Sequence, residues 1–271
     1  MIHLSERLQK IADNINEGET MADIGTDHGF LPIYLIQSGK SQKVIMTDIS
    51  EASLMKAKLN SRSCTVKYAG TAEFRNGSGL EVLRRSEVDT VVIAGMGGKL
   101  ITEIMAADIR HTCSFKKFIM QPRIGQGILR KFLLENGFTI VKEDLVKEGR
   151  HIPEIITALS PAASDDFLPD GSNLNVSKGN LDLYGIGNEP ADHVIYRVPP
   201  WIINSGPIAG EFLTRSMDRE KEKLKNIMLS NKRDLPKEES VCEDIAYLKK
   251  LKKDYERMHE NGNQKKDSIR K

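Results

Sequence analysis

The feature that most constrains the fold of this chain is an alternation of short apolar runs with glycine-containing or acidic loops and helical stretches. Five such runs occur before residue 121, and successive runs are separated by about the length that a crossover helix between parallel strands requires. The runs are Met21–Ile24, Val44–Met46, Thr65–Tyr68, Thr90–Ala94 and Phe118–Met120. This alternation predicts an α/β fold built on a parallel sheet.

Two further apolar segments, Phe138–Val141 and Glu154–Leu159, close this region. The polar stretch between them is too short and too charged for a crossover helix, so we expect an antiparallel hairpin and an antiparallel last strand. A helix with Leu4, Leu8 and Ile11 along one face is expected before the first strand.

The chain divides into three predicted segments. Residues 1–160 form the α/β domain, and residues 161–204, rich in Pro, Gly, Ser, Asn and Asp, form an irregular insertion. Residues 205–271 predict two helices joined near Pro236, which indicates a helical hairpin of coiled-coil type. This last segment has 17 Lys and Arg against 13 Asp and Glu. It therefore holds the basic surplus of a chain whose net charge is only +2.

Composition excludes several classes of protein. No apolar run approaches the roughly 18 residues of a spanning helix, and the amino-terminal segment has no continuous apolar stretch of the kind found in a secretory signal. We therefore expect a cytoplasmic protein without membrane contact. Cys64, Cys113 and Cys242 lie far apart and form no CxxC pair, which argues against a disulfide framework and against a cysteine-based metal site.

The segment DIGTDHGFLP, residues 23–32, directly follows the first predicted strand and precedes a helix. Gly25 and Gly29 would allow a tight turn and close approach of a ligand. The dehydrogenase pattern GxGxxG is absent, and Asp27 in the middle of the loop would repel a pyrophosphate. A cationic sulfonium tolerates this carboxylate, so S-adenosylmethionine fits better than NAD. His28, beside the carboxylate, is either a ligand contact or a structural histidine.

Asp48 ends the second predicted strand, 23 residues after Gly25. A carboxylate at this place in a βαβ unit can accept hydrogen bonds from both ribose hydroxyls of an adenosine-containing cofactor. It could instead cap the helix that follows. The spacing from Gly25 favours the ribose contact.

The fourth predicted strand ends in AGMGGKL, residues 94–100. Three glycines in four positions are not expected of packing residues, whereas a plain turn would need only one; the pattern indicates close approach of a planar group. Ligands of open parallel sheets bind at the carboxyl ends of the strands, here in the crevice between the first and fourth. Gln121 and Pro122 end the fifth strand at the same edge. Arg123 is either a phosphate or substrate contact or a solvated loop charge.

These segments resemble the bacterial tRNA adenine(22)-N1 methyltransferase family of Rossmann-like class I methyltransferases with a carboxy-terminal coiled coil. The resemblance covers about residues 4–160 and 205–260, and it is carried by LSERL, DIGTDHGFLP, GMGG, QP and a helical hairpin after a GP pair. It implies a class I methyltransferase sheet, S-adenosylmethionine as cofactor and tRNA as partner. The expected reaction is methylation of N1 of adenine 22.

The loops and the resemblance together define a candidate site. Expected cofactor contacts are Asp23, Gly25, His28, Gly29, Asp48, Ile49, Ser78 and Ala94. Expected catalytic residues are Asp27, Gly95, Met96 and Gly97, and expected substrate contacts are Gln121, Pro122 and Arg123. Asp27 would stabilise the charge that develops on the adenine, and the Ala94–Gly98 loop would form a wall for the base. No general base is required, because adenine N1 already carries a lone pair.

Three positions depart from the family pattern. Ser78 stands where relatives typically carry an acid facing the adenine of the cofactor, Arg123 where they carry asparagine, and Pro153 where they carry tyrosine. The insertion at 161–204 is also longer than in relatives. Two alternatives therefore remain: a methyltransferase acting on a protein or small molecule, and a catalytically inactive relative that binds RNA or another partner. An NAD-dependent oxidoreductase is disfavoured by Asp27 and by the antiparallel final hairpin.

Overall fold

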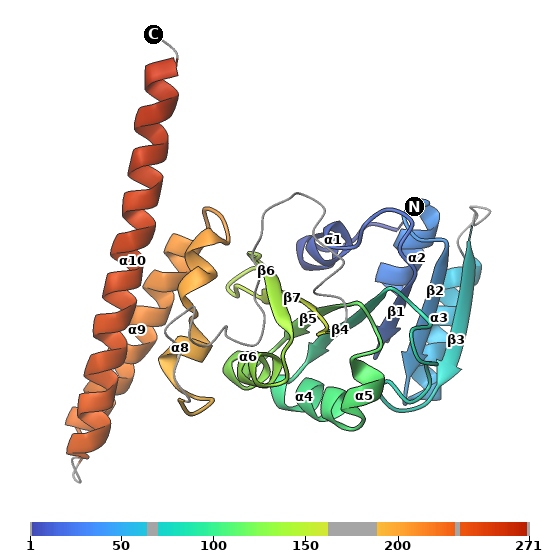
Figure 1. Ribbon diagram of the computed structural model, residues 1–271, viewed down its shortest axis with the longest axis horizontal. Coiled ribbons are helices and arrows are strands. Elements are labelled where there is room, and N and C mark those ends of the chain that lie inside the picture. Colours follow the sequence, from blue (N-terminus) through green and yellow to red (C-terminus); the bar gives the residue numbers. More distant parts are fainter. Residues whose placement is uncertain (1, 64–69, 162–188, 231–233, 270–271) are drawn as a thin grey trace. The chain divides into compact units, whose positions relative to one another are not determined.

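The computed structural model describes residues 2–63, 70–161, 189–230 and 234–269 (Figure 1). The chain forms two compact units, Met1–Ala191 and Asp192–Lys271. The boundary between them falls within the segment that the sequence predicts as an insertion, most of which, residues 162–188, lies outside the described residues.

The first unit is built on a seven-stranded sheet with the order β3-β2-β1-β4-β5-β7-β6. Strands β1 to β5 are parallel, whereas β7 runs antiparallel to both β5 and β6. The predicted parallel sheet with an antiparallel last strand is therefore confirmed. The strands are β1 (Met21–Ile24), β2 (Lys43–Asp48), β3 (Thr71–Asn76), β4 (Thr90–Met96), β5 (Lys117–Pro122), β6 (Thr139–Leu145) and β7 (Glu154–Leu159).

The third strand differs from the sequence prediction. The segment Thr65–Tyr68 lies outside the described residues, and the strand that pairs with β2 is Thr71–Asn76 at the edge of the sheet. This strand is only half-buried, and its Arg75 donates to Glu87 at 2.7 Å in an ion-pair network that includes Lys43. An edge strand held by charged side chains has no continuous apolar run, which is why the sequence pattern missed it.

Helices cover both faces of the sheet. On one face α1 (Glu6–Asp13), α2 (Phe30–Gln37) and α3 (Glu51–Ser63) bury apolar side chains against β1, β2 and β4, with Ile11, Leu35 and Val92 completely inaccessible to solvent. On the other face lie α4 (Gly98–Ala106), α5 (Ile109–Thr112) and α6 (Gln126–Glu135), grouped together in Figure 1. Phe118 of β5 packs edge-to-face against Phe138 on this second side.

A buried ion-pair cluster ties α6 to the antiparallel strands. Arg130 is fully buried and donates from Nε and one terminal nitrogen to the two oxygens of Glu143, at 2.9 and 2.7 Å. The same terminal nitrogen also donates to Glu154 at 2.5 Å. These carboxylates hold the pKa of Arg130 above its ordinary value even though burial alone would lower it. Removal of one partner from such a cluster typically costs about 3–5 kcal/mol, because it leaves a buried charge uncompensated.

The second unit is helical. It contains α8 (Val194–Arg197), the 3-10 turn η1 (Pro200–Asn204), α9 (Ala209–Met228) and α10 (Leu235–Ile269). Helices α9 and α10 pack side by side, which confirms the expected helical hairpin (Figure 1). Arg197 joins α8 to both long helices, with ion pairs to Glu220 at 2.5 Å and Asp244 at 2.7 Å. None of the described helices is both long and apolar enough to cross a membrane.

Candidate active site

Four loops meet at the carboxyl edge of the sheet. Strand β1 lies between β2 and β4, and Ile24 is in register with both Thr47 and Ile93. The strand order reverses between β1 and β4: β2 and β3 lie on one side of this point, and β5, β7 and β6 lie on the other. Ligands of open parallel sheets bind at such a switch point. The loops that leave β1, β2, β4 and β5 therefore lie together at this edge of the sheet, where the sequence predicts the cofactor site.

The loop after β1 approaches the end of β4 very closely. Gly25 has φ +75°, and a Cβ at this position would lie 2.2 Å from Cε of Met96. The left-handed backbone therefore requires glycine, and the flexible end of the Met96 side chain occupies the space that a Cβ would take. The amides of Gly25 and Thr26 donate to the carbonyl of Thr47 at 2.9 Å, which fixes the loop against β2. Gly29, also with positive φ, begins α2.

Asp23 forms the floor of this loop. Its carboxylate is buried, with 7% exposure, and accepts a hydrogen bond from Oγ1 of Thr26 at 2.6 Å. Burial raises the pKa of Asp23 to about 6; the Thr26 bond lowers it, nearby Asp48 raises it and Arg7 lowers it. A buried carboxyl with a perturbed pKa at a strand exit is typical of a functional site.

Asp48 is not the capping residue of the helix that follows it. Ser50 precedes α3 and its hydroxyl accepts from the amide of Ser53 at 3.3 Å, as a helix cap does. Oδ1 of Asp48 accepts from the amide of Ser50 at 2.8 Å, whereas the only contact of Oδ2 among the described residues is a long one, 3.4 Å, with the amide of Asp27. One oxygen of this half-buried carboxylate is thus available to a ligand, which favours the ribose interpretation.

Asp27 lies on the β2 side of the site. Its backbone is in the left-handed region, with φ +43°, and its exposed carboxylate is 3.3 Å from Nζ of Lys56 and 3.4 Å from Nε2 of His28. The imidazole of His28 stacks on the ring of Phe30, with centroids 5.3 Å apart. These contacts place Asp27 beside Asp48 and α3.

The three glycines at the end of β4 and directly after it differ in what the fold requires at each position. Gly95 has φ +79°. Gly98 is a packing residue, contrary to the sequence interpretation, because a Cβ there would lie 2.1 Å from the carbonyl oxygen of Gly125. Gly97 has an ordinary extended backbone, and its nearest neighbour would be Cγ1 of Ile124 at 3.8 Å. Within the described part of the chain nothing requires glycine at 97, which is consistent with close approach of a ligand.

The residues at the end of β5 and directly after it divide into buried and exposed ones. Gln121 is buried; its Oε1 accepts from Arg7 at 3.0 Å and its Nε2 donates to the carbonyl of Pro122 at 3.1 Å. Its amide is therefore held by the protein and shapes the floor of the site. Arg123 is exposed, and its amide donates to the carbonyl of Met96 at 2.8 Å.

The loop after β3 completes the site on the cofactor side. Asn76 donates from Nδ2 to the carbonyls of Asp48 and Ile49, both at 3.1 Å, which joins the ends of β2 and β3. Ser78 is exposed, and its amide donates to Glu81 at 3.0 Å. The side chain of Ile49 is 75% exposed and offers an apolar face next to the ribose carboxylate. Ala94, half-buried, lies at the end of β4.

Sequence analysis missed two residues that shape the site, Arg7 and Asn76. Arg7 comes from α1 and reaches Gln121, 114 positions away in the chain. It also lies 3.4 Å from Glu148. A contact of this range has no local pattern; the only signal was its place within the LSERL segment.

Comparison with known proteins agrees with this geometry. Residues 4–156 match the family model described as a methyltransferase domain, and this is the class that the sheet and its carboxyl-edge site define. The tRNA (adenine(22)-N(1))-methyltransferase of Bacillus subtilis is 33% identical over 177 residues, which cover 64% of this chain and 71% of the relative. The chain belongs to the tRNA (adenine(22)-N1)-methyltransferase family within that class.

Solved structures show the same fold. The crystal structure of the B. subtilis M1A22 tRNA methyltransferase TrmK is 25% identical with a TM-score of 0.71, and the match covers 93% of this chain and 99% of that one. The structure of M. capricolum TrmK in complex with S-adenosylhomocysteine is 22% identical with a TM-score of 0.69, over 92% and 98% of the two chains. The fold expected from the resemblance is confirmed.

Proposed function

We propose that this protein transfers the methyl group of S-adenosylmethionine to N1 of an adenine in tRNA, and that the adenine is nucleotide 22. The observation that carries the proposal is the carboxyl-edge site, with Asp48 available beside the β1 loop, in a chain 33% identical to a B. subtilis enzyme of that name. A tRNA substrate also supports the expectation of a cytoplasmic enzyme.

The residues present fit the cofactor. Oδ2 of Asp48 is available to the ribose, and each hydrogen bond to such a charged group contributes about 1.5–3 kcal/mol. The exposed side chain of Ile49 would lie against the adenine ring, with the hydroxyl of Ser78 replacing the usual acid. The loop from Asp23 to Gly29 would hold the methionine end, where Asp27 complements the positive sulfonium.

Little acid–base chemistry is needed in this site. When bound, S-adenosylmethionine supplies an electrophilic methyl group, and the lone pair of adenine N1 attacks it without prior deprotonation. The protein therefore has to hold the base in line and exclude water. Gly97 leaves space for the base. Two backbone hydrogen bonds between the β4 and β5 loops, from Gly98 to Ile124 and from Arg123 to Met96, fix the backbone around it.

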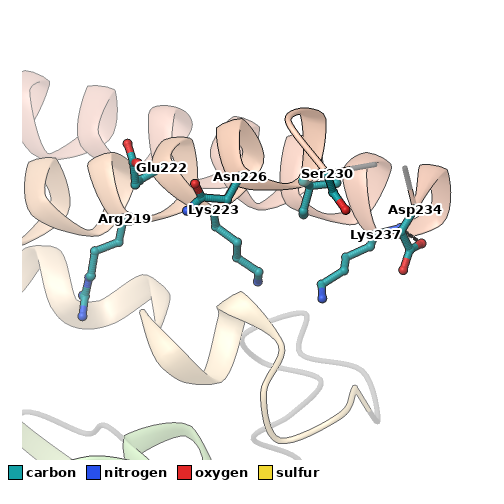
Figure 2. A pocket seen from close by; sticks show the side chains of 8 residues that line it. Arg219, Glu222, Lys223, Asn226, Ser230, Asp234 and Lys237 are labelled. Atoms are coloured by element: carbon teal, nitrogen blue, oxygen red, sulfur yellow. Dashed lines mark hydrogen bonds between the residues drawn. The ribbon is translucent and has the colours of Figure 1, made fainter. Parts of the chain in front are cut away.

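The helical unit offers contacts to RNA phosphates. A pocket at the turn of the hairpin is lined by residues of α9, α10 and their connection (Figure 2). The side chains of Arg219, Lys223 and Lys237 extend to the same side, whereas Glu222 points away from them. No carboxylate pairs with Arg219 or Lys237 among the residues that the structure describes, so both cations are available to phosphate.

A charge-matched pair of variants tests this RNA surface. Arg219→Gln with Lys237→Gln should reduce the slope of log tRNA affinity against log salt by about two, because each phosphate contact contributes about one. The control, Lys249→Gln with Lys250→Gln, removes two exposed charges elsewhere on α10 and should leave the slope nearly unchanged. Equal slopes for both variants would assign the pocket no role in RNA binding.

The activity is tested by substrate class. The protein is incubated with radiolabelled S-adenosylmethionine in three separate reactions, which contain bulk tRNA, cellular protein or small metabolites. After digestion of the tRNA, the labelled nucleoside is identified. We expect label in tRNA as 1-methyladenosine. Label only in protein or metabolites would support the alternative methyltransferase, and cofactor binding without any transfer would support an inactive relative.

A further inference from the structure

One exposed side chain near the acceptor side of the site is unused by the function described so far. Ile124, in the loop between β5 and α6, is 73% exposed. Its carbonyl accepts from the amide of Gly98 at 2.7 Å, and the preceding amide, of Arg123, donates to Met96 at 2.8 Å. Hydrogen bonds thus fix the backbone at Arg123 and Ile124, while the aliphatic side chain of Ile124 is exposed to solvent. This apolar side chain gains little from folding and is available to an external partner at the site.

The surroundings of Ile124 identify the side of the site to which it belongs. Its Cγ1 is the nearest neighbour of a Cβ built on Gly97, at 3.8 Å, and Gly97 is the glycine that the fold itself does not require. Ile128, on the first turn of α6, adds a second partly exposed apolar side chain. Ile49, the other strongly exposed isoleucine of the site, lies beside Asp48 and therefore on the cofactor side.

A cation adjoins this apolar side chain. Arg123 is exposed, and no partner of its guanidinium occurs among the described residues. An aliphatic wedge next to an arginine is the combination with which proteins unstack a nucleotide: the wedge replaces the lost stacking contact and the cation holds the flanking phosphate. An adenine within folded RNA has to leave its stack before N1 can reach an active site.

We propose that Ile124 inserts into the RNA base stack in the place of the target adenine, with Arg123 on the flanking phosphate, so that the extruded base is held against Gly97. The proposal rests on the proposed function, whose tRNA substrate it makes more specific. Ile124 is a positioning residue, since it acts on the conformation of the RNA and not on the transferred methyl group.

The test separates base extrusion from catalysis. A tRNA transcript with 2-aminopurine at the target position reports unstacking by a rise in fluorescence when protein and S-adenosylhomocysteine are added. We expect this rise for the wild type and for Met55→Ala, which removes a 53% exposed methionine from α3. Ile124→Ala should lose most of it. Ile124→Leu, which keeps the aliphatic volume, should restore it.

Kinetics on two substrates complete the test. On folded tRNA, Ile124→Ala should lower kcat/KM about tenfold or more while the affinity for S-adenosylhomocysteine stays unchanged. On a transcript with an abasic site facing the target adenine, the variant should come within about twofold of the wild type, because extrusion then costs little. An equal loss on both substrates, or a variant that behaves like Met55→Ala on folded tRNA, would overturn the proposal. Absence of tRNA methylation by the wild type would instead overturn the proposed function.

Discussion

Replacement of Asp23 by asparagine should stabilise the protein against unfolding and weaken the site. The substitution keeps an oxygen that can accept from Thr26 and removes the buried charge. In the unfolded chain the carboxyl has its ordinary pKa of 3.8, whereas burial raises it to about 6 in the folded protein. At 1.36 kcal/mol for each pKa unit, the ionised carboxylate therefore lowers the free energy of unfolding by about 3 kcal/mol at pH 7.5.

The raised pKa of Asp23 determines how the free energy of unfolding changes with pH. Between pH 3.8 and 6 the folded protein binds more protons at Asp23 than the unfolded chain does, so stability falls as the pH rises through this range. The same two pKa values leave a penalty of only about 1.5 kcal/mol at pH 5. The advantage of Asp23→Asn over the wild type should consequently halve between pH 7.5 and pH 5.

Thermal unfolding followed by circular dichroism measures this advantage. For a unit of this size about 3 kcal/mol corresponds to a Tm that is about 6–12 °C higher at pH 7.5. Asp89→Asn is the matched control: burial raises the pKa of Asp89, but bonds from Lys116 and Thr20 outweigh it and lower the pKa overall. The Asp89→Asn variant should be less stable than the wild type by an amount that stays nearly constant between pH 5 and 7.5. The reason is that the ionised Asp89 carboxylate of the wild type loses its stabilising effect only at lower pH. If Asp23→Asn melts below the wild type, or if its advantage does not change with pH, the reasoning is refuted.

Three further predictions concern the site. Asp48→Ala should weaken S-adenosylhomocysteine binding at least tenfold by calorimetry, because it removes about 1.5–3 kcal/mol for each charge-assisted bond; unchanged affinity would leave Asp48 a purely local role. Because its backbone amide contacts Asp48 and its carboxylate pairs with Lys56 of α3, Asp27→Asn should weaken cofactor binding and preserve the single-turnover rate at saturating cofactor. A slower rate with unchanged affinity would instead assign Asp27 the catalytic role expected from the sequence. Gly98→Ala should cost about 1–3 kcal/mol of stability through overpacking, while Gly97→Val should keep the Tm and block methylation; the reverse pattern in melting and activity assays would contradict the glycine assignments.

Sequence patterns were sufficient for the central strands because these are buried on both faces. β1, β4 and β5 are buried and contain short runs of mainly apolar residues, and the charged stretch before Glu154–Leu159 favoured a hairpin over a crossover helix. β3 could not be found in this way, since its edge position lets Glu73 and Arg75 replace apolar residues.

In the candidate site, too, features set by neighbouring residues could be predicted from the sequence, whereas contacts between distant segments could not. The relation of Gly25 to Asp48 follows from the geometry of one βαβ unit, so spacing alone indicated it. The reason for Gly98 depends on Gly125, which a different strand brings within reach, and the orientation of Gln121 depends on Arg7. Contacts between distant segments leave no periodicity in the sequence, and only the folded structure shows them.

The measurement that tests the central claim most directly compares two tRNA transcripts that differ only in whether nucleotide 22 is adenine or guanine. Each is incubated with the purified protein and S-adenosylmethionine, digested to nucleosides and analysed by mass spectrometry. The account predicts close to one 1-methyladenosine per adenine-22 transcript and none in the guanine-22 transcript. Equal methylation of both transcripts, or methylation of neither while the cofactor binds, would contradict it.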